Sequence, residues 1–168
     1  MKKWSEFERA IEQTNAYYQR KGRGAVAKLP NGVQTVKQAG TIKNFRVKTP
    51  CDFIGHVDGV PVAFDVKTTS RKTAFPIFTR GKNNKETYSL KKHQAMFLSQ
   101  FDNGGRAYVL IYSIPKDVSW LVPIEEYLML CQAMKNSGKK SINFIHFVGF
   151  EIERNGMFWD YAEKIIGG

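Results

Sequence analysis

Cysteines are scarce in this sequence, and long hydrophobic runs are missing. Cys51 and Cys131 are the only cysteines among 168 residues and lie far apart, so we expect neither a disulfide scaffold nor a zinc motif. No apolar run approaches the roughly 20 residues that a membrane-spanning helix needs. The opening residues MKKWSEFERA also lack the apolar stretch of a secretory signal. These absences predict a cytoplasmic protein with free thiols and no membrane partner.

Acidic residues are scarce as well. The chain has 26 lysines and arginines against 15 aspartates and glutamates, a formal net charge of +11. No acid occurs between Glu12 and Asp52, or between Asp65 and Glu86. Such an excess indicates a polyanionic partner, and neither basic run has the pattern of a membrane-binding amphipathic helix. Two solvated basic faces are the simpler explanation, but two basic runs flanking an acidic hairpin favour a nucleic-acid groove.

Hydrophobic residues make up 42% of the chain, which is enough for a buried core. Their pattern predicts a single α/β domain over residues 1–168, built around a central sheet. We expect helices at 5–20, 89–100, 124–136 and 159–166, and strands at 25–29, 106–113, 120–122 and 145–152. Ser5 and Ser89 are the expected N-caps of the first two helices. Residues 70–87 are polar, basic and glycine-containing, so we expect a loop there.

Residues 33–48 form an unusual basic segment, which we call the stalk. Apolar and basic side chains alternate on both sides of Gly40 between Val33 and Val47. This pattern predicts a two-stranded β-ribbon. Isolated hairpins are marginally stable in water, so we expect contacts with a partner chain or a ligand to stabilise the stalk.

Residues 51–69, CDFIGHVDGVPVAFDVKTT, carry the clearest hairpin signal. Asp58-Gly59 between alternating runs predicts a two-residue type I′ turn, which sets Val57 opposite Val60. Because side chains alternate between faces, one face is predicted to be apolar core: Cys51, Phe53, Val57, Val60, Val62, Phe64 and Val66. The other face is predicted to carry Asp52, Ile54, His56, Ala63, Asp65 and Lys67.

The same register places Asp52 directly opposite Asp65. Like charges so placed destabilise a strand pair unless they share a proton or hold a cation. Oxygen ligands suit a hard divalent ion, for which Mg²⁺ is the usual cellular choice. Lys67 lies on the same face and can contact a charged reacting group. The alternative is an exposed strand face with two unrelated acids and a neutralising lysine.

Asp52 followed by Asp65-Val66-Lys67 resembles the signature of the PD-(D/E)XK nuclease superfamily. The surrounding sequence resembles the RecU family of Holliday junction resolvases, found in Firmicutes and their phages. The resemblance extends over nearly the whole chain and rests on these motifs: IEQTNAYYQRKGRGAVAKLP, VQTVK, the 51–69 hairpin, KTAFP, His93-Gln94, GGRAYVLIYS and NSGKKSI.

This resemblance implies a restriction-endonuclease-like fold, with a central mixed sheet flanked by helices and a protruding basic β-ribbon. It also implies an endonuclease that acts as a homodimer in recombination and DNA repair, resolving four-way junctions by paired symmetric nicks. Two alternatives stay open: a non-catalytic nucleic-acid-binding protein, and a nuclease of the same superfamily with another DNA target. The opposed acids favour a nuclease, since a pure binder has no use for them in a basic groove.

The resemblance also implies residue roles. Asp52, Asp65 and Gln94 match the family's magnesium ligands, with Mn²⁺ as a substitute metal and the Val66 carbonyl as a further candidate ligand. Lys67 matches the lysine that stabilises the transition state. Asp65 stands where the family usually has glutamate, so the metal must sit closer to the strand.

The family also uses a threonine two residues before its first aspartate, a position that Pro50 occupies here. Thr49 beside it, Glu8 and His93 are candidates for supporting roles, although Glu8 could equally cap its helix and His93 could equally serve helix packing. The segment 74–93 is longer than in the family, which could alter how a substrate arm is held. The residues expected to bind DNA are Arg20, Lys21, Arg23, Lys37, Lys43, Arg46, Lys48, Arg71, Lys72, Arg80, Lys82 and Lys85.

Overall fold

The computed structural model describes residues 3–30, 32–46 and 48–167, without the side chains of residues 3–4, 33–36, 38 and 43–46. The side chains of Lys43 and Arg46, both predicted to bind DNA, therefore lie outside the described residues. None of the helices in these ranges combines the length and apolar character needed to cross a bilayer.

A seven-stranded sheet forms the centre of the molecule, in the order β1-β4-β5-β9-β10-β12-β13. Strands β5 and β9 are parallel and the other neighbours are antiparallel, so the sheet is mixed, as predicted. Strand β5 is long and has a partner on each side. The strands are β1 (Gly24–Lys28), β4 (Phe53–Val57), β5 (Val60–Thr69), β9 (Arg106–Ser113), β10 (Val118–Pro123), β12 (Glu151–Asn155) and β13 (Phe158–Asp160).

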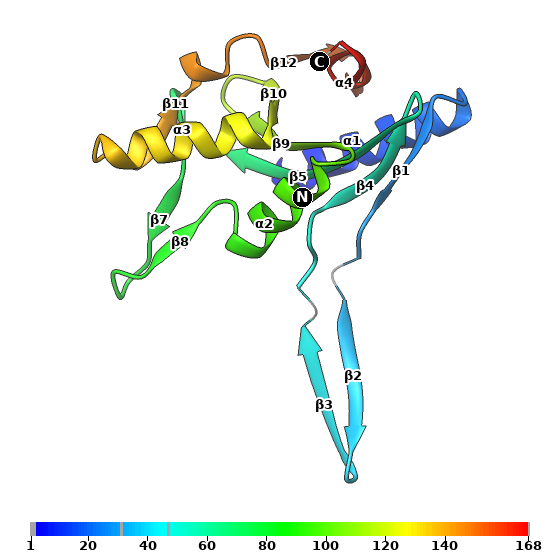
Figure 1. Cartoon of the computed structure of the whole chain (residues 1–168), viewed down its shortest axis with the longest axis vertical. Coiled ribbons are helices and arrows are strands. Elements are labelled where there is room, and N and C mark those ends of the chain that lie inside the picture. Colours follow the sequence, from blue (N-terminus) through cyan, green and yellow to red (C-terminus); the bar gives the residue numbers. More distant parts are fainter. Residues whose placement is uncertain (1–2, 31, 47, 168) are drawn as a thin grey trace.

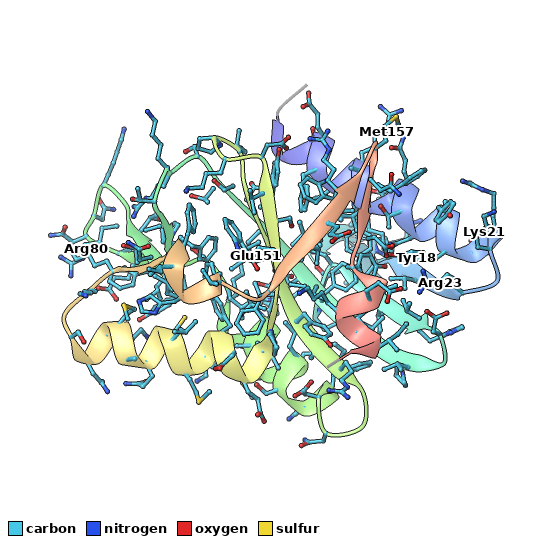
Figure 2. The ribbon with its side chains drawn as sticks, turned by 90° about the horizontal axis from the view of Figure 1, so that it is seen from above. Tyr18, Lys21, Arg23, Arg80, Glu151 and Met157 are labelled. Carbon is cyan, nitrogen blue, oxygen red and sulfur yellow. The ribbon has the colours of Figure 1, made fainter. Side chains whose placement is uncertain are left out.

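Helices cover the two faces of this sheet (Figure 1). The helical elements are α1 (Lys3–Arg20), α2 (Lys92–Phe101), α3 (Ile124–Asn136), the 3-10 helix η1 (Phe144–Phe147) and α4 (Ala162–Ile166). The end of α1, with Tyr18 and the adjacent Lys21, lies at the opposite end of the body from Arg80 (Figure 2).

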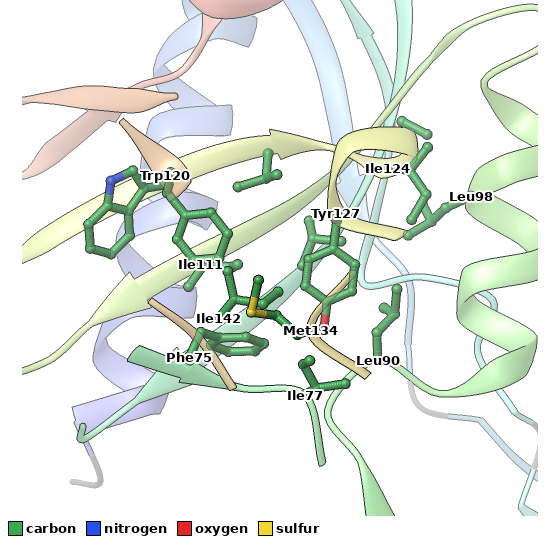
Figure 3. Packing of buried hydrophobic residues seen from close by; sticks show 14 of the residues in the cluster. Phe75, Ile77, Leu90, Leu98, Ile111, Trp120, Ile124, Tyr127, Met134 and Ile142 are labelled. Atoms are coloured by element: carbon green, nitrogen blue, oxygen red, sulfur yellow. The ribbon is translucent and has the colours of Figure 1, made fainter. Parts of the chain in front are cut away.

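Two hydrophobic clusters hold these layers together, one on each face of the sheet. On one face, Phe7 and Ile11 of α1 pack with Phe64 of β5. On the other face, residues of α2 and α3 pack over the sheet, with Leu98 and Tyr127 among them (Figure 3). Strand β5 is therefore covered on both faces, which explains why a carboxylate in its middle is removed from water.

Two hairpins extend from the body on the same side (Figure 1). The stalk contains the strands β2 (Val33–Gln38) and β3 (Thr41–Arg46), which pair only with each other among the described strands. The second hairpin consists of β7 (Phe78–Arg80) and β8 (Glu86–Tyr88). Beside it, β6 (Ala74–Pro76) pairs with β11 (Ser141–Asn143). The predicted ribbon is thus present, but the loop predicted at 70–87 was wrong, because short strands form there: β6 pairs with the distant β11, and β7 and β8 pair with each other.

Some predicted element boundaries were also wrong. The first helix begins at Lys3, so Ser5 lies inside its first turn and is not its N-cap. The second helix begins only at Lys92, because the Ser89 hydroxyl donates to the carbonyl of Pro76 instead of capping a helix. The segments 145–152 and 159–166 are each divided between a strand and a short helical element. By contrast, β9 and α3 have the predicted bounds.

Candidate active site

The hairpin β4–β5 positions the candidate site. Asp58 and Gly59 both have positive φ, 47° and 81°, as a type I′ turn requires. Phe53 pairs with Phe64 and Val57 with Val60, so the predicted register is confirmed. One residue was placed on the wrong face: Cys51 belongs to the cluster under α2 and α3, because β4 begins only at Phe53 and the strand alternation does not extend back to Cys51.

Asp65 is the centre of the site. It lies in the middle of β5 and is 0% exposed. The Lys67 Nζ lies 2.5 Å from Asp65 Oδ2, and the Gln94 Nε2 donates a hydrogen bond of 2.6 Å to Asp65 Oδ1. Oδ2 of the carboxylate thus already has one cationic neighbour, the ammonium of Lys67. A divalent cation would share this oxygen with Lys67 or displace its ammonium.

Burial also changes the protonation of this carboxylate. It raises the pKa of Asp65 to about 7, an effect that Lys67 opposes and that the neighbouring Asp52 reinforces. Removing a carboxylate from water disfavours its charged form. The free site therefore has a tendency to retain a proton, which a bound cation would displace.

Asp52 is fixed beside the same strand. Its Oδ2 accepts a hydrogen bond of 2.8 Å from the backbone N–H of Val66. Its backbone carbonyl accepts one of 2.8 Å from the N–H of Leu29. The Val66 contact thus involves its N–H group, while the sequence suggested its carbonyl as a ligand. These bonds hold Asp52 next to Asp65, where the register predicts it.

Gln94 reaches the site from the first turn of α2. Its Nε2 faces Asp65, while its Oε1 accepts a hydrogen bond of 3.1 Å from the backbone N–H of Lys91. The amide nitrogen, not the amide oxygen, therefore points at the carboxylate. Because a metal ligand must be the oxygen, Gln94 would have to reverse its amide group, giving up the Lys91 bond, before it could bind a cation.

The donor set fits a hard divalent cation. Two carboxylates and one amide supply only oxygen ligands, which suit Mg²⁺ or Mn²⁺. No cluster of three or more His, Cys, Asp or Glu side chains occurs in the part of the chain that the structure describes, so waters or phosphate oxygens would complete the coordination. Burial, with smaller effects of Asp65 and Asp52, raises the pKa of the nearby Cys51 thiol to about 12, which makes it a poor nucleophile.

A family model described as Recombination protein U matches residues 2–165. The chain belongs to the RecU family. A RecU relative from Streptococcus thermophilus strain LMD-9, named Holliday junction resolvase RecU, is 27% identical over 96% of this chain and 83% of its own length. One of the same name from Lactococcus lactis subsp. cremoris strain MG1363 is 33% identical over 92% and 72%. Among solved structures, the Holliday junction resolvase Hjc of Archaeoglobus fulgidus aligns with a TM-score of 0.37 and 16% identity over 67% of this chain and 74% of its own.

The predicted supporting residues occupy varied positions in this RecU fold. Glu8 forms an ion pair of 3.0 Å with Lys28, which also contacts Glu12 at 2.7 Å. Because Lys28 pairs with Phe53 on β4, this group of charges lies one residue along from Asp52. His93 and Thr49 are half-buried, the former next to Gln94.

The predicted DNA-binding residues fall into separate groups. Arg23 pairs with Asp58 at 2.7 Å and with Glu163 at 3.3 Å, so it stabilises the turn end of the β4–β5 hairpin. Lys21 and Arg23 lie at the end of the body opposite Arg80 (Figure 2). Lys37 and Lys48 are exposed residues of the stalk. The remaining exposed basic residues follow β5 in the sequence: Arg71, Lys72, Arg80, Lys82 and Lys85.

Proposed function

We propose that this chain is an endonuclease that resolves four-way DNA junctions by paired symmetric nicks in recombination and repair. The observation that carries the proposal is the fully buried Asp65, with Lys67 and Gln94 at its carboxylate and Asp52 fixed beside it. Membership in the RecU family supports a nuclease. The names of the Streptococcus and Lactococcus relatives support the junction as the substrate.

We further propose that Asp52 and Asp65 hold Mg²⁺, with Gln94 as an additional ligand after its amide reverses and Mn²⁺ as a substitute metal. The chemistry that such a cation supplies is a bound water of lowered pKa and neutralisation of charge at the scissile phosphate. Asp65 gives up its proton when the site is loaded. The burial of the Asp65 carboxylate beside a second carboxylate, that of Asp52, supports this assignment.

Lys67 has a separate role in the proposal. Its ammonium lies beside Asp65 while its side chain keeps 19% exposure, so it can contact a phosphate oxygen without leaving the carboxylate. A positive charge fixed where negative charge develops stabilises a transition state without further reorganisation. In the proposal, Lys67 thus stabilises the negative charge that develops on the phosphate.

The remaining parts of the proposal concern the substrate. Exposed basic residues of the stalk contact backbone phosphates, which position the DNA without reading its sequence. A four-way junction has near two-fold symmetry, and two symmetric nicks require two active sites. A C2 homodimer supplies them.

The test is the variant Asp52→Asn, assayed on a four-way junction with Mg²⁺ and with Mn²⁺. Loss of one carboxylate removes a cation ligand and eases the repulsion of phosphate, so cleavage should be abolished while junction binding survives or tightens. The matched control is Glu153→Gln, which removes one exposed negative charge on β12 and should cleave normally. Cleavage by Asp52→Asn at the wild-type rate would contradict the site. A wild-type chain that binds junctions but never nicks them would indicate a non-catalytic DNA-binding protein.

A further inference from the structure

Two acid-free parts of the sequence meet at one end of the body. No acid occurs at residues 66–85 or at residues 127–150. Strand β6 pairs with β11, the Ile77 N–H donates to the Lys140 carbonyl over 3.0 Å, and the Phe144 N–H donates to the Thr73 carbonyl over 3.0 Å. These bonds bring the loop after α3 against the β7–β8 hairpin. Lysines separated by more than fifty positions in the sequence therefore share one end of the molecule.

The β7–β8 hairpin is firmly anchored at its base. Ile77 and Phe78 are 2% and 8% exposed. The Phe78 and Tyr88 rings lie 5.6 Å apart between centroids, and the Lys135 Nζ lies 4.4 Å from the centre of the Tyr88 ring. The base thus connects the hairpin to the end of α3, and its direction is set by the core.

The tip of the hairpin is exposed but locally ordered. The Gly81 N–H donates to the Lys85 carbonyl and the Asn84 N–H donates to the Gly81 carbonyl, each over 3.0 Å. Lys82 and Lys85 are both exposed. Because the backbone of the tip is held by these bonds, its lysines can bind a ligand with less loss of conformational freedom than on a free loop.

The charge of this end is almost entirely positive. Glu86 is the only acid between residues 66 and 101, and Arg80 pairs with it at 3.2 Å. We use the name second basic surface for the exposed residues Arg80, Lys82, Lys85, Lys135, Lys139 and Lys140. Concentrated positive charge of this kind creates a field that attracts a polyanion.

The second basic surface lies on the substrate side of the protein. In Figure 1 the β7–β8 hairpin and the stalk extend to the same side of the body, with α2 between them. Helix α2 carries Gln94, which contacts the catalytic carboxylate. A duplex that enters between the two hairpins would therefore pass the candidate site.

We propose that the second basic surface binds the sugar-phosphate backbone of one duplex arm of the substrate, and that Lys135, Lys139 and Lys140 are DNA-binding residues. This inference rests on the proposed junction-cutting function. Lysine ammonium groups on flexible stems contact phosphates without reading bases. The surface therefore holds an arm in place but does not distinguish a branched from a linear DNA.

The experiment uses the double variant Lys85→Ala/Lys139→Ala, which takes one exposed lysine from each of the two segments. Binding to a four-way junction and to a linear duplex is measured across a salt series. Each lost phosphate contact flattens the log–log salt dependence by about 0.9, so the slope should fall by about 1.8 on both DNAs.

The matched control is Arg9→Ala/Lys164→Ala, which removes two exposed positive charges from α1 and α4 and should leave the slope unchanged. If the wild type binds and nicks junctions but Lys85→Ala/Lys139→Ala keeps the wild-type slope, this inference is wrong and the proposed function stands. If the control flattens the slope equally, the effect belongs to net charge and the inference is likewise overturned. If the wild type neither binds nor nicks junctions, the proposed function itself fails.

Discussion

The hairpins β4–β5 and β2–β3 have the same kind of turn and very different surroundings. Asp58-Gly59 has φ values of 47° and 81°, and Ala39-Gly40 has values of 49° and 78°. Yet β4–β5 lies inside the sheet between β1 and β9, with a hydrophobic cluster on each face. The stalk β2–β3 pairs only with itself among the described strands.

The two hairpins differ in packing and not in turn geometry, so packing is what suits each of them to a different role. Burial of β5 perturbs the protonation of Asp65 and fixes it against Lys67 and Gln94, which suits chemistry at one phosphate. In the stalk, the described lysines Lys37 and Lys48 are exposed, and exposed charge suits contacts with many phosphates. Changes in the first hairpin should therefore alter rate, and changes in the second should alter affinity.

The largest effect among the following predictions is expected at Lys67. Lys67→Ala should slow cleavage by about 10²-fold or more, as for removal of one preorganised charge-stabilising group, while junction affinity changes little. The comparison variant is Lys72→Ala, an exposed lysine five positions later, which should weaken binding and leave the rate at saturation unchanged. Single-turnover cleavage and equilibrium binding separate the two effects. Equal losses of rate and affinity in Lys67→Ala would show that Lys67 only contacts a phosphate and does not stabilise the transition state.

The stalk should show the opposite behaviour. Replacing Lys37, Lys43 and Arg46 together by alanine should weaken junction binding and flatten its salt slope by about 2.7 if all three contact phosphates. If the stalk recognises branched DNA, affinity for a four-way junction should fall more than affinity for linear duplex. Titrations of both DNAs across a salt series measure this. An unchanged slope would show that the stalk is not a phosphate-binding element.

The pH dependence of stability tests the burial of Asp65. Since burial raises the pKa of Asp65 to about 7, above the value of about 4 for an exposed aspartate, the folded chain holds a proton that the unfolded chain releases. Its contribution to stability is therefore complete at low pH and is lost as pH rises from about 4 to 7. Without metal, the difference between the melting temperatures of Asp65→Asn and the wild type should increase in favour of Asp65→Asn as pH rises through this range.

Addition of Mg²⁺ at pH 8 gives the complementary result. The cation should raise the melting temperature of the wild type, because it binds only the folded site, and should not raise that of Asp65→Asn. A constant difference in melting temperature between the two proteins from pH 4 to 8 would contradict the burial effect.

The smallest effect concerns the two turn glycines. Gly59 and Gly40 both have positive φ, and a Cβ added at either position would meet no atom within 4 Å, so alanine costs only backbone strain, about 1 kcal/mol. Gly59→Ala should lower the melting temperature of the body by about 2–4 °C. Gly40→Ala should leave it unchanged, because the stalk unfolds without exposing the core. Equal losses in the two variants would show that the stalk is coupled to the body.

Local patterns allowed the sequence to predict much of the fold. The β4–β5 register followed from Asp58-Gly59 and the alternation around it, and the stalk followed from alternation around Gly40. Strand β9 and helix α3 were predicted with their observed bounds because each is a long run of one pattern. In these segments the local preference and the tertiary structure agree.

Other features depend on contacts between distant segments and could not be predicted. The three-residue strands β7 and β8 lie in a polar, lysine-rich stretch, and only the anchoring of Ile77 and Phe78 reveals them. The approach of Gln94 to Asp65 was expected only from family resemblance, since 29 residues separate them. The ion pair of Glu8 with Lys28 depends on the packing of α1 against β1 and left no local signal.

We infer that the β4–β5 hairpin cuts DNA and that the stalk binds it. The most direct test measures affinity and single-turnover cleavage of one four-way junction for Asp52→Asn and for the triple variant Lys37→Ala/Lys43→Ala/Arg46→Ala, with cleavage followed at saturating protein. We expect tight binding without cleavage for the first variant, and weak binding with a wild-type cleavage rate at saturation for the second. Normal cleavage by Asp52→Asn, or a triple variant that binds normally but does not cut, would contradict it.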